Sequence, residues 1–271
     1  MILCDRQPAA IPVTRSLTEW LLRNHRPAMQ RCSEHFVRGP ALFDVPAAGW
    51  MLPLAAVEPL AGTIDSQLLP PDVSRSAEIR RKGFIAGRLC AERCLAELGM
   101  PGRGVGRLGS GAPSWPHGAV GSITHSASHA FAVACGASSV RSMGVDSEAL
   151  IRAEDAEAVG LLCCTASERM SLLGGVDGGL TLTLMFSAKE SFYKAIYPLV
   201  ERYVDFADAE VSGIDFHRQE FVVGPAPARP FAQLLPTLRG RFSVDEAGHL
   251  HTAVTCMAGD ELRVDDVRGG K

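Results

Sequence analysis

A continuous stretch of helical apolar spacing, residues 72–98, constrains the fold of this chain more than any other feature. Within "DVSRSAEIRRKGFIAGRLCAERCLAELGM" the apolar side chains recur on one face, which predicts one long amphipathic helix. Asp72 or Ser74 suits its N-cap, and Gly99 suits the residue after its last turn. The predicted apolar face consists of Ile79, Phe84, Ile85, Leu89, Cys90, Leu95 and Leu98.

Strand-like segments follow this helix and recur after a second helix. The first strands are expected within residues 121–136 and 142–150, and the second helix over 187–197, before Pro198. A hairpin is expected over 239–256 with its turn at "DEAG", and a further helix around residues 16–25. This order predicts an α+β protein of two similar α/β halves. Their expected bounds are 1–140 and 141–262, followed by a loose tail over 263–271.

Composition narrows the classes of protein. The formal net charge of −3 argues against a nucleic-acid-binding protein, which normally carries a basic excess. No apolar run reaches the ~18 residues of a membrane span, and Asp5, Pro8 and Arg15 interrupt any secretory signal, so a cytoplasmic protein is expected. The eight cysteines include no CxxC pair, which favours reduced, buried thiols. His249 and His251 are expected on the surface or in loops.

The sequence "GVDSE" places two acids two positions apart in the strand expected over 142–150. Because side chains at i and i+2 of a strand share a face, Asp146 and Glu148 would aim two carboxylates at one place. Like charges so close raise each other's pKa unless a cation intervenes, and magnesium prefers oxygen ligands of this kind. The alternative is a solvated strand end that carries two acids.

The segment "MFSAKESFYKAIYP", residues 185–198, contains two of only four lysines in a chain with 23 arginines. Lys189 and Lys194 lie on either side of Glu190, and an ammonium group can give up a proton where a guanidinium in practice cannot. The alternative reading requires no function. Ser187 and Glu190 have the spacing of a capping box, and Glu190 and Lys194 have that of a helical ion pair.

Possible phosphate contacts lie earlier in the chain. Arg80 and Arg88 belong to the helix expected over 72–98, and a guanidinium fork matches two phosphate oxygens. In "GSITHS", Ser122 and Thr124 share one strand face and His125 ends the strand, and all three can donate to phosphate. The alternatives are arginines that only solvate a helix face and a partly buried histidine with satisfied hydrogen bonds.

Together these motifs resemble the 4′-phosphopantetheinyl transferase family. The sequence "GVDSE" followed by "FSAKESFYK" is similar to the family signature. The segments "RRKGFIAGRLCA", "GAPSWPHGAVGSITHS" and "TLRGRFSV" with "LHTAV" resemble, in the same order, the branch that contains the enterobactin-synthase transferase component. The resemblance covers roughly residues 68–256.

The resemblance implies a fold and a reaction. The fold is two similar halves related by a pseudo-twofold axis, each with an antiparallel sheet packed on a long helix, and coenzyme A in the cleft between them. The reaction transfers the phosphopantetheine arm of coenzyme A to a serine of an apo acyl, peptidyl or aryl carrier protein and releases adenosine 3′,5′-bisphosphate. A monomer is expected, and the pathway served, siderophore synthesis among others, stays open.

By motif position the resemblance assigns magnesium ligands, lysines near the pyrophosphate, and residues that contact the phosphates and nucleotide end of coenzyme A. The magnesium ligands are Asp146, Glu148 and Glu190, and the lysines near the pyrophosphate are Lys189 and Lys194. The contacts to the phosphates and nucleotide end are Arg80, Arg88, Ser122 and His125. Two positions depart from the family pattern. Ser110 replaces a lysine, with Arg107 nearby as its candidate substitute, and Ser147 replaces a bulky aliphatic residue and should face away from the carboxylates.

On this interpretation Glu190, directly or through a water, receives the proton of the carrier serine, and Lys194 stabilises or protonates the leaving group. A metal-dependent phosphohydrolase acting on coenzyme A would use the same residues with water as nucleophile. A non-catalytic coenzyme A sensor would not need all the acids and lysines, and a structural protein explains none of them. The segment "LLCCTASERMSLL", residues 161–173, is either a carrier-docking surface or a core helix.

Overall fold

The computed structural model describes Leu21, Asn24 and residues 26–62, 64, 69–138, 140–172, 178–227 and 235–260. The rest of the helix expected around 16–25, most of the glycine-rich loop after Leu172 and the tail over 263–271 lie outside the described residues. Contacts divide the chain into two compact units, Met1–Gly39 with Ala47–Gly136 and Pro40–Pro46 with Ala137–Lys271.

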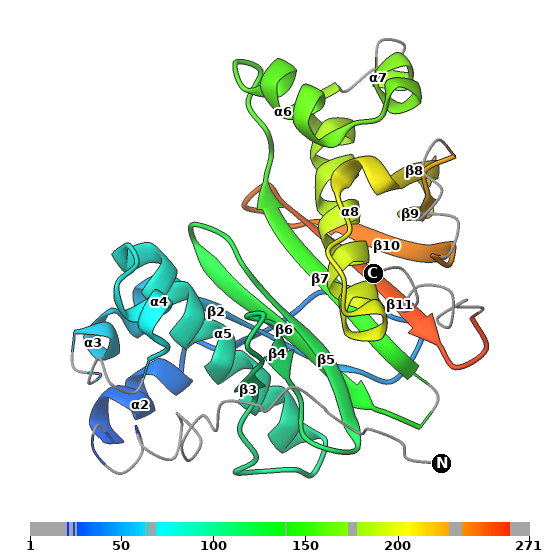
Figure 1. Cartoon of the computed structure of the whole chain (residues 1–271). Coiled ribbons are helices and arrows are strands. Elements are labelled where there is room, and N and C mark those ends of the chain that lie inside the picture. The colour runs from blue at the N-terminus through cyan, green and yellow to red at the C-terminus, as the bar shows by residue number, and fades with distance from the viewer. Residues whose placement is uncertain are drawn as a thin grey trace. The chain divides into compact units, whose positions relative to one another are not determined.

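The first unit contains a four-stranded antiparallel sheet covered by one long helix. The strand order is β1 (Val37–Arg38), β2 (Ala48–Pro53), β6 (His129–Gly136), β5 (Ala119–His125). Helix α5 (Glu78–Glu97) packs on β2, β5 and β6 (Figure 1). The smaller elements are α2 (Arg26–Ser33), η1 (Leu54–Val57), α3 (Glu58–Ala61), α4 (Pro71–Ser74), β3 (Gly106–Arg107) and β4 (Pro113–Ser114).

The expected helix over 72–98 is present but is interrupted near its start. α4 ends at Ser74, and α5 begins at Glu78 with Ala77 as an N-cap that makes no side-chain hydrogen bond, so the predicted caps Asp72 and Ser74 are wrong. Gly99 does end the helix, with the positive φ of 77° that glycine tolerates. Most of the predicted apolar face is buried or partly buried, but Ile79, in the first turn, is 48% exposed.

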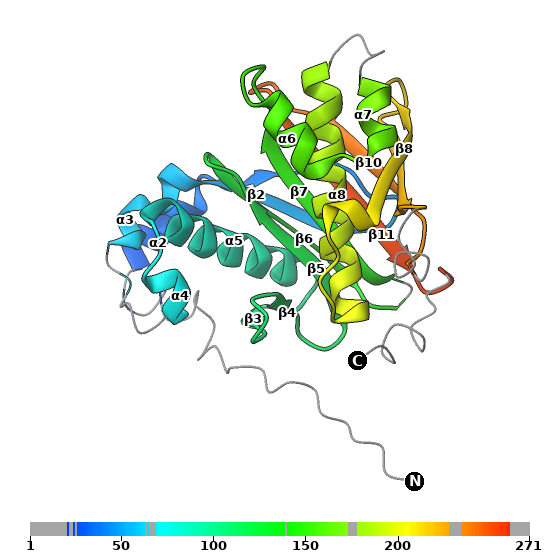
Figure 2. The same ribbon diagram turned by 45° about the horizontal axis from the view of Figure 1, so that its top comes forward.

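The second unit contains a five-stranded antiparallel sheet with its own long helix. The strand order is β7 (Val140–Ala149), β11 (His249–Met257), β10 (Leu238–Val244), β9 (Glu220–Pro225), β8 (Ala209–Asp215). Helix α8 (Gly178–Val200) lies along β7 and β11 (Figure 2). The remaining elements are α6 (Ala156–Cys163), α7 (Ala166–Leu172) and η3 (Phe206–Asp208).

Helix α8 is longer than the predicted segment 187–197. Its first turns, "GGLTLTLMF", alternate apolar and polar residues in a way typical of a strand, yet they form helix, and the side chains from Leu182 to Met185 are all buried. Thr183 is used twice here: its hydroxyl donates to the carbonyl of Gly179 (2.7 Å) and accepts from the amide of Ile151 (2.9 Å). Pro198 lies inside the helix, near its end.

The expected hairpin is confirmed. β10 and β11 pair antiparallel across Asp245–Gly248, where Gly248 has a φ of 81°. The α+β class is likewise confirmed by two antiparallel sheets with packed helices. Within the described residues, none of the helices has both the length and the apolar character that crossing a bilayer requires.

Candidate active site

The carboxylate of Asp146 is held between β7 and α8. Its side chain is 3% exposed, and it lies on β7 opposite Thr252 of β11. Oδ1 accepts a hydrogen bond from Nζ of Lys194 at 2.6 Å, and Oδ2 accepts one from Oγ of Ser187 at 2.9 Å. Both donors come from α8, so the helix supplies a cation and a hydroxyl to one strand carboxylate.

A cluster of buried hydroxyl groups supports this contact. Thr252 Oγ1 lies 2.8 Å from Ser187 Oγ and 2.7 Å from Ser191 Oγ, and it donates to the carbonyl of Ser187. The capping-box alternative for Ser187 is therefore wrong, because α8 begins at Gly178 and places Ser187 in its interior. Ser187 and Thr252 orient Asp146, a role that sequence reasoning missed.

Glu148 and Glu190 share this electrostatic environment. The pKa of the Glu148 carboxyl is raised to about 7, chiefly by burial; Asp146 and Glu190 contribute to the rise, and Lys194 opposes it. Burial also raises the pKa of Glu190, with Lys194 opposing and Asp146 adding to that rise. The structure thus brings the three predicted acids and Lys194 into one interacting group within the second unit.

The donor chemistry of this group suits a hard divalent cation. All three acids offer oxygen ligands, and the pKa values of Glu148 and Glu190 are raised chiefly by burial, with the neighbouring carboxylate of Asp146 adding to the rise. Among the described residues, however, no three acidic, histidine or cysteine side chains are grouped closely enough to hold a metal ion as they stand. In this structure Lys194 supplies the positive charge on Asp146 Oδ1.

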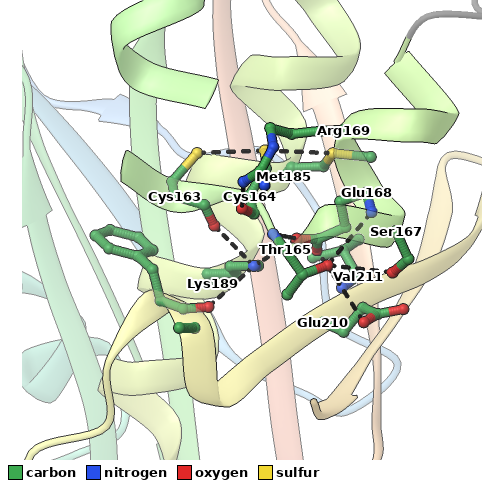
Figure 3. A network of polar contacts seen from close by, with 12 residues as sticks. Cys163, Cys164, Thr165, Ser167, Glu168, Arg169, Met185, Lys189, Glu210 and Val211 are labelled. Carbon is green, nitrogen blue, oxygen red and sulfur yellow. Dashed lines mark hydrogen bonds and ion pairs between the residues drawn. The ribbon is translucent and has the colours of Figure 1, made fainter. Parts of the chain in front are cut away.

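Lys189 lies apart from this group. Its side chain is only 1% exposed, and Nζ donates to Glu168 Oε2 (2.7 Å) and to the carbonyls of Cys163 (2.8 Å) and Phe206 (3.0 Å) (Figure 3). An ammonium group has three donors, and all three are used. The phosphate contact expected of Lys189 is therefore replaced in this structure by contacts with the protein itself.

A small pocket of about 60 Å³ lies beside α8. Glu190 lines it together with Tyr193, Tyr203 and Phe206. Its volume is far below the ~300 Å³ of a typical ligand pocket, so it is too small for a whole nucleotide.

Arg88 is a buried cation on α5 in the first unit. The residue is 7% exposed, its guanidinium lies over the ring of Phe84, and Nε has no hydrogen-bond partner among the described residues. Burial, with Arg107 adding to the effect, lowers the pKa of Arg88 to about 10. A buried guanidinium donor without an acceptor suits an anion.

Other predicted contacts of the first unit have mixed surroundings. Arg80 is 59% exposed and lies 3.8 Å from Asp72, whereas Arg107 makes a bidentate pair with Asp72 at 2.7 and 2.8 Å. Ser122 is buried on β5, and His125 is exposed at the end of that strand. The imidazole of His125 lies directly against Gly83 of α5, where a Cβ would collide with it.

Two expectations about the opposite face of β7 have different outcomes. Ser147 turns away from the carboxylates, as expected, and its Oγ lies 2.9 Å from Nδ1 of His251. The surface or loop placement of His251 is wrong: it is 1% exposed on β11, and burial lowers its pKa. Strand alternation does not reveal this burial, because β11 is buried at consecutive positions and therefore on both of its faces.

Segment 161–173 is not a uniform core helix. Leu161, Leu162 and Met170 are 65%, 69% and 70% exposed on α6 and α7, and Leu172 packs partly against the core. Arg169 turns inward, where Nη1 donates to the carbonyl of Cys164 at 2.6 Å.

Comparisons with known proteins agree with these features. Residues 68–135 match the 4′-phosphopantetheinyl transferase N-terminal domain, and residues 142–245 match the 4′-phosphopantetheinyl transferase superfamily. The chain is 34% identical over 195 residues to 4′-phosphopantetheinyl transferase PptT of Mycobacterium tuberculosis, covering 68% of this chain and 82% of that relative.

Two further relatives carry related names and are covered less completely. The transferase Npt of Nocardia iowensis is 39% identical over 141 residues, which are 52% of this chain and 62% of the relative. Enterobactin synthase component D of Salmonella typhi is 40% identical over 129 residues, which are 46% of this chain and 52% of the relative. With its buried acids, α8 lysines and both matched regions, this chain belongs to the 4′-phosphopantetheinyl transferase superfamily.

Proposed function

We propose that this chain transfers the 4′-phosphopantetheine group from coenzyme A to a serine of an apo carrier protein and releases adenosine 3′,5′-bisphosphate. The single observation that carries the proposal is the interacting group of Asp146, Glu148, Glu190 and Lys194 in a member of this superfamily. Such a group suits a reaction in which a hydroxyl attacks the β-phosphorus of a pyrophosphate. The negative charge of the pyrophosphate must be neutralised in that reaction, and the group offers an ammonium and oxygen ligands for a cation.

Glu190 is the proposed base. Burial and Asp146 raise its pKa, which makes its carboxylate a stronger proton acceptor than an exposed glutamate. It accepts the proton of the carrier serine, directly or through a water, as the oxygen–phosphorus bond forms. Lys194, one helical turn further along α8, is placed to stabilise or protonate the departing bisphosphate.

Asp146, Glu148 and Glu190 are the proposed ligands of magnesium. When bound, the ion neutralises charge on the pyrophosphate oxygens. The chain's own contribution is orientation: Ser187 and the buried Thr252 fix Asp146, so its carboxylate has few alternative positions.

Coenzyme A is proposed to bind between two similar halves. The support is that each unit carries an antiparallel sheet with one long helix packed on it. Arg88 offers a buried, unpaired Nε–H to a phosphate at the nucleotide end, and Arg80, Ser122 and His125 are the further proposed contacts. The pocket lined by Tyr193 and Tyr203 suits part of the narrow pantetheine arm.

The carrier protein is proposed to dock on α6 and α7. Leu161, Leu162 and Met170 expose apolar surface there, and both helices pack on α8, which carries Glu190. Replacing Leu162 and Met170 with serine should raise KM for the carrier and leave KM for coenzyme A unchanged. An unchanged KM for the carrier would place docking elsewhere.

The proposed function is tested by mass spectrometry of apo acyl, peptidyl and aryl carrier domains. Each is incubated with the chain, magnesium and coenzyme A, and a gain of one phosphopantetheine group on the carrier serine is expected. Matched reactions without carrier measure release of adenosine 3′,5′-bisphosphate into solution. Release without carrier, with no modified carrier in any reaction, would contradict the proposal and identify a phosphohydrolase.

A further inference from the structure

The ion pair between Lys189 and Glu168 is one of the most deeply buried polar contacts of the second unit. The two side chains are 1% and 2% exposed, and Nζ lies 2.7 Å from Oε2. Charges this deep are tolerated only when their hydrogen-bonding capacity is satisfied. Figure 3 shows that the contacts around the pair come from several separate segments of the chain.

Glu168 receives donors from two of these segments in addition to Lys189. Its Oε2 accepts from the amide of Thr165 (2.7 Å), and its Oε1 accepts from the amide of Val211 on β8 (2.7 Å). Thr165 Oγ1 in turn accepts from the amide of Glu168 (3.3 Å). These reciprocal bonds form a capping box at the start of α7.

Lys189 fastens α8 to the same group from the other side. Besides Glu168, it donates to the carbonyl of Cys163 at the end of α6 and to that of Phe206 in η3. One lysine therefore ties α8 to α6, α7 and η3, and through Glu168 to β8. Any rotation or shift of α8 would break several charge-assisted bonds in a site that water does not reach.

Glu190 is the next residue on α8. Successive helix residues are turned by about 100° from each other, so the direction of Lys189 fixes the direction in which Glu190 points. We propose that Lys189 is a positioning residue for the transfer reaction, which acts through Glu168 to hold Glu190 in place and does not itself contact the phosphates of coenzyme A. This inference rests on the proposed function.

The test compares Lys189→Met, Glu168→Gln and the double variant Lys189→Met/Glu168→Gln. The single lysine variant leaves a buried carboxylate without its cation, whereas the double variant removes both charges and keeps a side chain that suits a capping box. Arg152→Met is the matched control, because it removes the cation of an exposed ion pair in the same unit. Thermal unfolding identifies the temperature range in which every variant is folded.

Within that range, Lys189→Met should lower kcat about 100-fold, the scale of a small displacement of a catalytic group. Calorimetric binding of coenzyme A should stay within about threefold of the unchanged chain, since no phosphate contact is lost. The kcat of the double variant should be at least about tenfold higher than that of Lys189→Met. The kcat of Arg152→Met should match that of the unchanged chain. A larger loss of coenzyme A affinity in both Lys189→Met and the double variant, without recovery of kcat in the double variant, would overturn the inference in favour of direct phosphate contact.

Amide hydrogen exchange of α8 gives a readout that does not require activity. Amides around Glu190 should exchange faster in Lys189→Met and return towards the unchanged rate in the double variant. Unchanged exchange would overturn the positioning role even if kcat falls. If the unchanged chain modifies no carrier, the proposed function fails, while the exchange rates still decide whether the ion pair holds α8 in place.

Discussion

Nζ of Lys194 lies 2.6 Å from Oδ1 of Asp146, so a lysine forms an ion pair with one carboxylate oxygen of a proposed magnesium ligand. Lysine and metal would then compete for the same oxygen. We predict that Lys194→Gln strengthens binding of magnesium to the free chain by at least about tenfold, because a nearby positive charge is removed. Isothermal titration calorimetry without coenzyme A measures this. Unchanged or weaker binding would mean that Asp146 does not hold the metal.

Replacing Glu190 with glutamine should lower transfer by at least ~100-fold, the usual effect of losing a general base. The fold should persist, because glutamine has the same shape as glutamate and carries no charge. The cost of burying a charge, which raises the pKa of Glu190, is therefore removed. The readout is single-turnover modification of an apo carrier, with circular dichroism as the control for folding. Turnover close to that of the unchanged chain would remove Glu190 from the catalytic role.

Glu148 should make the stability of the metal-free chain depend on pH. Its pKa is raised from 4.5 to about 7, so between those values the folded chain keeps a proton that the unfolded chain has lost. The contribution of Glu148 to stability is therefore fully present at low pH and is lost as pH rises through 7.

Urea unfolding in EDTA at about pH 5 and about pH 8 checks this sign. The free energy of unfolding of the unchanged chain, minus that of Glu148→Gln, should decrease towards the higher pH. A difference that increases with pH would show that the carboxylate is stabilised in the folded chain.

Arg88→Met should weaken binding of coenzyme A by about tenfold or more, because a charge-assisted bond to phosphate is lost. If Arg88 holds the 3′-phosphate, the loss should be smaller for dephospho-coenzyme A, which lacks that group. Arg80→Met should have a weaker effect, since its side chain is 59% exposed. Equal losses for both ligands on Arg88→Met would assign the residue to another part of the nucleotide.

Gly144→Ala should destabilise the second unit by ~3 kcal/mol or more, because overpacking is costly where the obstacle is backbone. A Cβ on Gly144 of β7 would collide with the carbonyl oxygen of Ser191 on α8. Gly160→Ala in α6 is the control: its Cβ would have no contact closer than 3.9 Å, and alanine favours helix. Thermal unfolding of both variants gives the comparison, and a mild effect of Gly144→Ala would contradict the close approach of α8 and β7.

Local sequence patterns predicted the elements around the site well. Apolar spacing located α5, alternation located β7, and "DEAG" located the turn between β10 and β11. The start of α8 was not located, because the apolar residues from Leu182 to Met185 are all buried and leave no amphipathic pattern from which a helix can be recognised.

The order and chemistry of the motifs determined the superfamily. Strand periodicity predicted that Asp146 and Glu148 share a face, and the family resemblance added Glu190 to them. Only the tertiary structure decided which partner each lysine takes. Lys194 pairs with Asp146, 48 residues away, and Lys189 pairs with Glu168, 21 residues away. No local pattern encodes such pairs, because the energy of a buried charge depends on the segments that the fold packs around it.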